Sequence, residues 1–139
     1  MAKSDALLAR VPLFEGLSKK ELRSIAKELQ EETFNEGQDI VTAGKAGGRF
    51  YLIVDGRAKV IKGDRTRTTT LGPGDYFGEM SIIDKGPRSA TVRAESYVRA
   101  LSIASWNFLS VLEENFSIAR KIMETLSARI RESDKSLTA

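Results

Sequence analysis

The middle of the chain, from about residue 33 to 103, consists of short strand-like runs separated by turns that contain glycine. Residues 50–54 and 57–61 flank Asp55-Gly56, which is the composition of a two-residue hairpin turn. Further turns and strands follow at close spacing: a reversal at Lys62–Arg65, a threonine run at 66–71, a turn at Gly72–Asp75, and strands at 91–94 and 98–103. This series favours an antiparallel β-roll or jelly roll over a βαβ fold.

Helical patterns flank the strand region on both sides. Ser18 and Glu21 have the spacing of a capping box, and the apolar residues after them recur at helical spacing, while residues 6–11 suggest a shorter helical piece. After Ser105, a plausible N-cap, one helix covers 106–114 and a second runs to about residue 133. Its apolar stripe contains Ile118, Ile122, Leu126 and Ile130.

We therefore expect an α+β, mainly β, fold in a single domain of residues 1–139. A helical lead-in at 1–32 precedes the antiparallel β-roll at 33–104, and two C-terminal helices follow at 105–134. A short phosphate-binding helix is expected inside the roll, within a segment at 77–92.

Composition excludes several classes of function. Among the 139 residues there is no cysteine and no histidine, so thiolate nucleophiles, Cys-based zinc sites and histidine bases are absent. The net charge of +3 comes from 22 basic and 19 acidic residues that are scattered along the chain, which argues against nucleic-acid binding. No apolar run is long enough to span a membrane, and the N-terminus lacks a signal-peptide core. We expect a cytoplasmic binding protein that is no enzyme and holds no metal or cofactor.

The residues between 78 and 88 combine groups that suit a phosphorylated ribose. Residues 78–83 lie between two strands and are long enough for a short helix, whose first N–H groups favour an anion. Gly78 permits close approach of a ligand to the backbone, and Arg88 follows Pro87 with a planar fork of donors for phosphate oxygens. Ionised Glu79 only accepts hydrogen bonds, so it suits sugar hydroxyls.

The run FGEMSIIDKGPRSATV resembles the phosphate-binding cassette of the cyclic-nucleotide-binding domain family, which includes catabolite activator proteins, protein kinase regulatory subunits and nucleotide-gated channels. The resemblance extends over nearly the whole chain, through VPLFEGLSKKEL, FYLIVDGRAKV and LGPGDYFGEM. It implies that Glu79 bonds the ribose 2′-hydroxyl and that Arg88 pairs with the cyclic phosphate. It also implies that Gly78, Met80, Ser81, Ser89 and Ala90 line the ribose-phosphate, and that the last helix covers the base through Leu126, Arg129 and Ile130.

The implied function is a regulatory sensor module that binds cAMP, or alternatively cGMP, and signals by repositioning its C-terminal helix. Ser89 leaves the choice of base open, because its hydroxyl can serve a phosphate oxygen or a guanine amino group. The expected partners are a protein effector or a missing output domain, and a second copy of the chain through the C-terminal helix. Two alternatives stay open: a degenerate, nucleotide-independent protein-interaction module, and a structural ion pair between Glu79 and Arg88. We expect Phe50, Tyr76 and Phe77 to belong to the core.

Overall fold

The computed structural model of the chain describes residues 3–62, 68–79, 81–84 and 86–133. Its internal contacts divide the chain into two compact units. Glu28–Leu109 form the first unit, which contains the strands, and Met1–Lys27 together with Ser110–Ala139 form the second, which is helical. That residues 1–139 act as a single domain stays a prediction.

The first unit is a β-roll of two antiparallel sheets with four strands each. One sheet has the order β1-β8-β3-β6 and comprises β1 (Gln30–Phe34), β3 (Arg49–Asp55), β6 (Tyr76–Phe77) and β8 (Val98–Ala104). The other has the order β2-β7-β4-β5 and comprises β2 (Asp39–Val41), β4 (Ala58–Ile61), β5 (Thr68–Leu71) and β7 (Thr91–Ala94). The predicted fold class is confirmed, although β1 begins at Gln30, before the expected start of the roll at residue 33.

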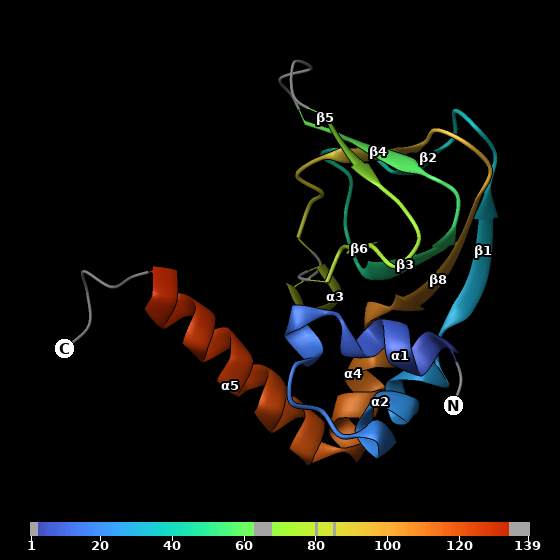
Figure 1. Ribbon diagram of the computed structural model, residues 1–139. Coiled ribbons are helices and arrows are strands. Elements are labelled where there is room, and N and C mark those ends of the chain that lie inside the picture. The colour runs from blue at the N-terminus through green and yellow to red at the C-terminus, as the bar shows by residue number, and fades with distance from the viewer. Residues whose placement is uncertain (1–2, 63–67, 80, 85, 134–139) are drawn as a thin grey trace. The chain divides into compact units, whose positions relative to one another are not determined.

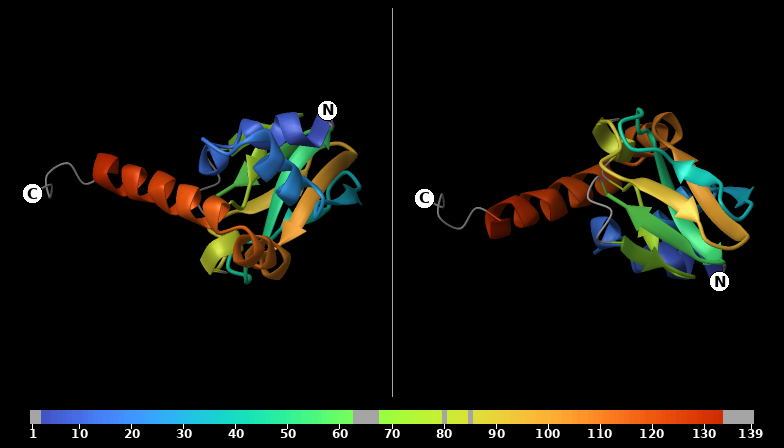
Figure 2. Two further views of the ribbon diagram at one scale, coloured as in Figure 1. Left: turned by 90° about the horizontal axis from the view of Figure 1, so that it is seen from below. Right: turned by 90° about the horizontal axis from the view of Figure 1, so that it is seen from above.

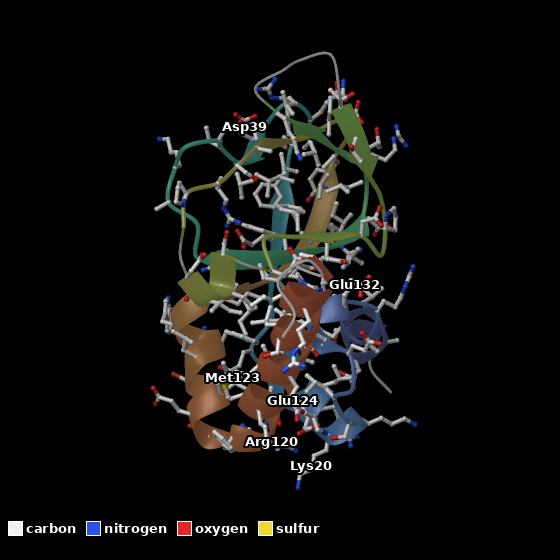
Figure 3. All side chains as sticks on the ribbon, turned by 90° about the vertical axis from the view of Figure 1, so that its left-hand side faces the viewer. Lys20, Asp39, Arg120, Met123, Glu124 and Glu132 are labelled. Atoms are coloured by element: carbon white, nitrogen blue, oxygen red, sulfur yellow. The ribbon has the colours of Figure 1, made fainter. Side chains whose placement is uncertain are left out.

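The two sheets face each other across an apolar core (Figure 1). Both sheets contribute buried side chains to it: Phe34, Ile40, Tyr51, Ile53, Ala58, Val92, Ala94, Val98 and Ala100. Strand β7 shows the period-two alternation that builds this core, with Val92 and Ala94 buried and Arg93 exposed between them. Arg93 forms an ion pair at 2.7 Å with Asp39 of β2, which is labelled in Figure 3.

The predicted hairpin at Asp55-Gly56 is wrong. Strand β3 pairs with β6 and β8, whereas β4 pairs with β5 and β7, so the chain crosses from one sheet to the other at this point. Gly56 permits the crossing, because its φ is 91° and a Cβ there would collide with the carbonyl oxygen of Tyr97. Asp-Gly marks a sharp turn, but the dipeptide carries no information about which strands pair beyond it.

The predicted turn at Gly72–Asp75 is confirmed. The Asp75 N–H donates to the Gly72 carbonyl at 2.9 Å, and the Gly72 N–H donates to Oδ2 of Asp75 at 2.8 Å. The Gly74 N–H also donates to the Ile53 carbonyl at 2.8 Å, which fastens the turn to β3. The reversal expected after residue 62 agrees with the antiparallel pairing of β4 with β5, but residues 63–67 lie outside the described residues.

The second unit is helical and has α5 as its longest described helix, which Figure 2 shows as unbroken. Its elements are α1 (Lys3–Ala9), the 3-10 helix η1 (Pro12–Phe14), α2 (Lys19–Ala26) and α5 (Phe116–Ser133), and α4 (Ser105–Glu114) runs from the roll into it. The capping box of Ser18 and Glu21 is confirmed, since each side chain accepts the backbone N–H of the other residue. No helix among the described residues is long and apolar enough to cross a membrane.

Glu21 also joins α2 to the start of α5. Its carboxylate accepts from Nζ of Lys121 at 2.7 Å and from Oγ of Ser117 at 2.6 Å, and its side chain is only 12% exposed. The Lys121 ammonium, helped by the Ser117 hydroxyl and the Ser18 N–H, lowers the pKa of Glu21 from 4.5 to about 2. Glu21 is therefore ionised in the folded protein over the whole physiological range of pH.

Candidate ligand-binding site

A cavity of about 460 Å³ lies in the β-roll unit and contains most of the predicted site residues. The predicted residues that line it are Gly78, Glu79, Ser81, Arg88, Ser89 and Ala90. Met80, the seventh, lies outside the described residues. Six of the seven predicted residues therefore line one cavity, although they lie up to twelve residues apart in the sequence.

Gly78 sits where the backbone must approach its neighbours closely. Its φ is 84°, in the left-handed region that favours glycine. A Cβ at this position would lie 2.6 Å from the carbonyl oxygen of Arg49 and 2.6 Å from Nη1 of Arg88. A side chain at residue 78 would therefore push Arg88 away from the cavity, and glycine keeps the guanidinium at the cavity wall.

Arg88 is held in place by the segment between β2 and β3. Its Nη2 donates to the carbonyl oxygen of Arg49 at 2.7 Å, its N–H donates to the Lys45 carbonyl at 2.8 Å, and its own carbonyl accepts from the Gly44 N–H at 2.9 Å. The side chain is half-buried, and burial lowers the pKa of Arg88, partly offset by Tyr51. An arginine remains charged even so, which makes this an immobilised cation at the cavity wall.

Glu79 is half-buried and lines the same cavity as Arg88. The alternative of a structural ion pair between them is not supported, because in the described part of the chain no ion pair or hydrogen bond joins these two residues. Instead the Arg88 guanidinium uses a backbone carbonyl as its protein partner. The Glu79 carboxylate and the Arg88 guanidinium therefore line the same cavity without pairing with each other.

The short helix begins later than the sequence predicts. We expected it from residue 78, whereas α3 covers Ser81–Asp84, so Gly78 and Glu79 precede it. Its buried end is anchored by Ser105, whose Oγ donates to the Ile82 carbonyl at 2.8 Å. We expected Ser105 to be the N-cap of a helix at 106–114; α4 instead begins at Ser105 itself, and the Ser105 hydroxyl donates to the carbonyl of a different helix.

Gly47 fits tightly between the two ends of the cassette. Its N–H donates to the Gly86 carbonyl at 2.9 Å, and a Cβ at Gly47 would lie 2.6 Å from that oxygen and 2.7 Å from the Cβ of Ser81. Contacts this short force the neighbouring atoms to move. Gly47 therefore sets the separation between α3 and the segment that carries Arg88, a role that the sequence motif did not reveal.

The apolar part of the cavity lining was missed by sequence reasoning. It is lined by Val41, Val60, Phe77 and Val92, with Lys62 beside them. Phe77 was expected in the core, and it does stack on Tyr51 with ring centroids 5.0 Å apart, yet it also lines the cavity. The alternation along β7 marks Val92 as inward-facing, but no local signal distinguishes a cavity wall from a filled core.

The three residues expected to cover the base lie on α5. Leu126 and Arg129 are half-buried, and Ile130 is 65% exposed. All three belong to the helical unit, and their role as a base lid stays a prediction. Within the described residues there is no cluster of three or more Asp and Glu side chains that could hold a metal ion.

Comparisons with known proteins agree with this arrangement. The family model of the cyclic nucleotide-binding domain matches residues 31–115, which is more than half of the chain. The CRP-like cAMP-activated global transcriptional regulator of Mycobacterium tuberculosis strain H37Rv is 31% identical over 137 residues, which cover 96% of this chain and 61% of the regulator. The cAMP-dependent protein kinase regulatory subunit of Schizosaccharomyces pombe is 34% identical over 116 residues, which cover 84% of this chain and 28% of the subunit.

Among solved structures, the N-terminal domain of a transcriptional regulator from Streptomyces coelicolor A3(2) superposes with a TM-score of 0.84 and covers 99% of this chain and 96% of that domain. At 24% identity, this likeness shows the fold alone. The family match covers the roll and the cassette, and the chain spans less than two thirds of the length of the two relatives named above. The chain belongs to the cyclic nucleotide-binding domain family.

Proposed function

We propose that this chain is a regulatory sensor module that binds a cyclic nucleotide, with cAMP as its first ligand and cGMP as the competitor. The observation that carries the proposal is the meeting of Gly78, Glu79 and Arg88 in one cavity of about 460 Å³. A cavity of this volume lies within the range of small-molecule sites. The module binds its ligand without transforming it, and neither an enzymatic reaction nor nucleic-acid binding is part of the proposal.

The distribution of polar and apolar groups supports a nucleotide. Arg88 offers a fixed cation for the cyclic phosphate, and Glu79 offers an acceptor for the ribose hydroxyl. The apolar walls formed by Val41, Val60 and Val92 suit the face of a purine. Ser89 is exposed at the rim, so its hydroxyl is available to either a phosphate oxygen or the base.

Signalling would proceed through α5, whose Leu126, Arg129 and Ile130 we propose as the base lid. A ligand shifts such an equilibrium only by binding one state more tightly than the other, so the base must contact α5 in the favoured state. The relatives named above include a cAMP-activated transcriptional regulator and a cAMP-dependent kinase regulatory subunit, which supports cAMP as the ligand. The output would come from a protein effector or an output domain. The cytoplasmic location stays a prediction.

We also propose that α5 pairs with α5 of a second copy of the chain. Phe116, Met123 and Ile130 follow one another at intervals of seven residues and are 69%, 53% and 65% exposed. An apolar side chain every seventh residue on one helix face is typical of a helix that packs against a partner helix. Ile118 and Ile122, which we assigned to the same stripe as Ile130, are instead buried on another face.

Calorimetric titration of the chain with cAMP, and separately with cGMP, tests the proposed function. We expect one saturable site for each nucleotide and a higher melting temperature, since a ligand at 100 times its dissociation constant adds about 2.7 kcal/mol of stability. 5′-AMP, which lacks the cyclic phosphate, serves as the control ligand and is expected to bind more weakly. An unchanged melting temperature with millimolar cAMP and cGMP would overturn the proposal in favour of a nucleotide-independent module.

A further inference from the structure

A second cavity of about 340 Å³ lies in the roll unit, and its lining includes Arg88 and residues of the segment between β2 and β3. It shares Val41 and Arg88 with the first cavity. Its other polar lining comes from the side chains of Thr42, Lys45, Arg49 and Tyr51 and from the backbone at Gly47 and Gly48. The nucleotide site described above makes no use of these groups, apart from backbone atoms that hold Arg88.

The lining of this second cavity is strongly positive. Lys45, Arg49 and Arg88 line it, and none of the carboxylates among the described residues does. Arg49 is partly neutralised, because its Nη1 lies 3.8 Å from Oε2 of Glu32 and donates to Oγ of Ser102 at 3.0 Å. Lys45 and Arg88 have no carboxylate partner among the residues that the structure describes, so an excess of two positive charges faces the cavity.

Tyr51 adds an aromatic side chain with a hydroxyl to this lining. The residue is 6% exposed, and its hydroxyl lies close enough to the charges of Glu32, Arg49 and Arg88 for them to act on its pKa. Burial, together with the charge of Glu32, raises the pKa of Tyr51, so the phenol stays protonated and can donate. A protonated phenol in the wall of the cavity can donate a hydrogen bond to an oxyanion that enters it.

We propose that this second cavity binds a small oxyanion of the phosphate or sulfate class, held by Lys45, Arg49, Arg88 and the Tyr51 hydroxyl. The remaining N–H groups of two guanidiniums and one ammonium group are donors that match tetrahedral oxyanions in charge. The proposal does not require a nucleotide in the first cavity.

The shared Arg88 couples the two cavities. An anion in the second cavity and a cyclic phosphate in the first would both lie near the one Arg88 side chain, where their negative charges repel each other. Free oxyanion therefore weakens nucleotide binding, and by linkage the nucleotide weakens oxyanion binding by the same factor. This coupling rests on the proposed function, whereas the oxyanion site itself does not.

The test is a titration of the nucleotide-free chain with inorganic phosphate, at constant ionic strength made up with chloride, followed by backbone amide NMR shifts. We expect saturable shifts at Lys45, Gly48 and Arg49. Lys45→Gln removes one charged donor and is expected to weaken phosphate binding about tenfold. The matched control is Lys27→Gln, which removes the same charge from an exposed lysine of the helical unit and is expected to change the affinity less than twofold.

Several results would overturn the oxyanion site. One is the absence of saturable shifts in tens of millimolar phosphate. Another is a set of shifts confined to Gly78, Glu79 and Ser81, which would place the phosphate in the first cavity. The third is an equal loss of phosphate affinity in Lys45→Gln and Lys27→Gln. Failure of the proposed function is distinguishable, because it would abolish cAMP and cGMP binding while leaving the phosphate titration as expected.

Discussion

Replacing Arg88 by methionine separates a binding role from a structural one. Methionine keeps most of the apolar stem and removes the guanidinium, and with it the 2.7 Å bond to the Arg49 carbonyl. In the nucleotide-free protein this bond is offset by the cost of a half-buried cation that has no carboxylate partner in the described residues. We therefore expect the free energy of unfolding of the unliganded variant to stay within about 1 kcal/mol of the parent.

Nucleotide binding should respond very differently. A guanidinium that donates charge-assisted hydrogen bonds to a cyclic phosphate contributes about 3 kcal/mol for two such bonds, which corresponds to roughly a 150-fold loss of affinity when it is removed. Arg88→Lys keeps the charge but not the fork, so it should recover part of this loss. Arg57→Met, at an exposed arginine of the same unit that does not line the cavity, is the matched control and should bind cAMP like the parent.

Urea unfolding of the unliganded proteins and calorimetric titration with cAMP measure the two quantities independently. If Arg88 served a buried ion pair, removing it would cost about 3–5 kcal/mol of stability. An unliganded Arg88→Met protein destabilised by that amount, with cAMP affinity like that of the parent, would refute the reasoning.

Gly47→Ala should weaken cAMP binding about tenfold or more, because the added Cβ would displace Ser81 and Gly86. Gly72→Ala is the control and should bind cAMP like the parent, since a Cβ at Gly72 meets open space and its φ is not left-handed. Equal cAMP affinities for the two variants would contradict the positioning role of Gly47. Glu21 has a folded pKa of about 2 against 4.5 ordinarily, so it contributes at most about 3 kcal/mol above pH 4.5 and loses this as the pH falls toward 2. The stability gap between the parent and Glu21→Gln should therefore shrink from pH 7 to pH 3, and a gap that is constant with pH would exclude this account. Met123→Glu places a charge in the exposed stripe of α5, in the stretch labelled in Figure 3, and should shift the chain toward monomer in analytical ultracentrifugation; an unchanged mass would rule out pairing through this face.

Local signals in the sequence predicted much of this protein. The capping box at Ser18 and Glu21, the turn at Gly72–Asp75 and strand β7 are all confirmed, because each depends on residues close together in the chain. The close approach at Gly78 is also encoded locally, in a glycine with a left-handed φ at the entry to the cassette. Resemblance to a known cassette supplied the rest of the site prediction.

Tertiary structure decided what depends on partners far away in the sequence. The two strands around Asp55-Gly56 join different sheets, since pairing with β8 and β7 governs where each strand lies. Arg88 is anchored by the carbonyl of Arg49, 39 residues earlier, and Gly47 sets the spacing of the cassette from a separate segment. A dipeptide or a spacing specifies backbone conformation within a few residues, whereas sheet partners, cavity walls and the charge around a guanidinium are set only when distant segments pack together.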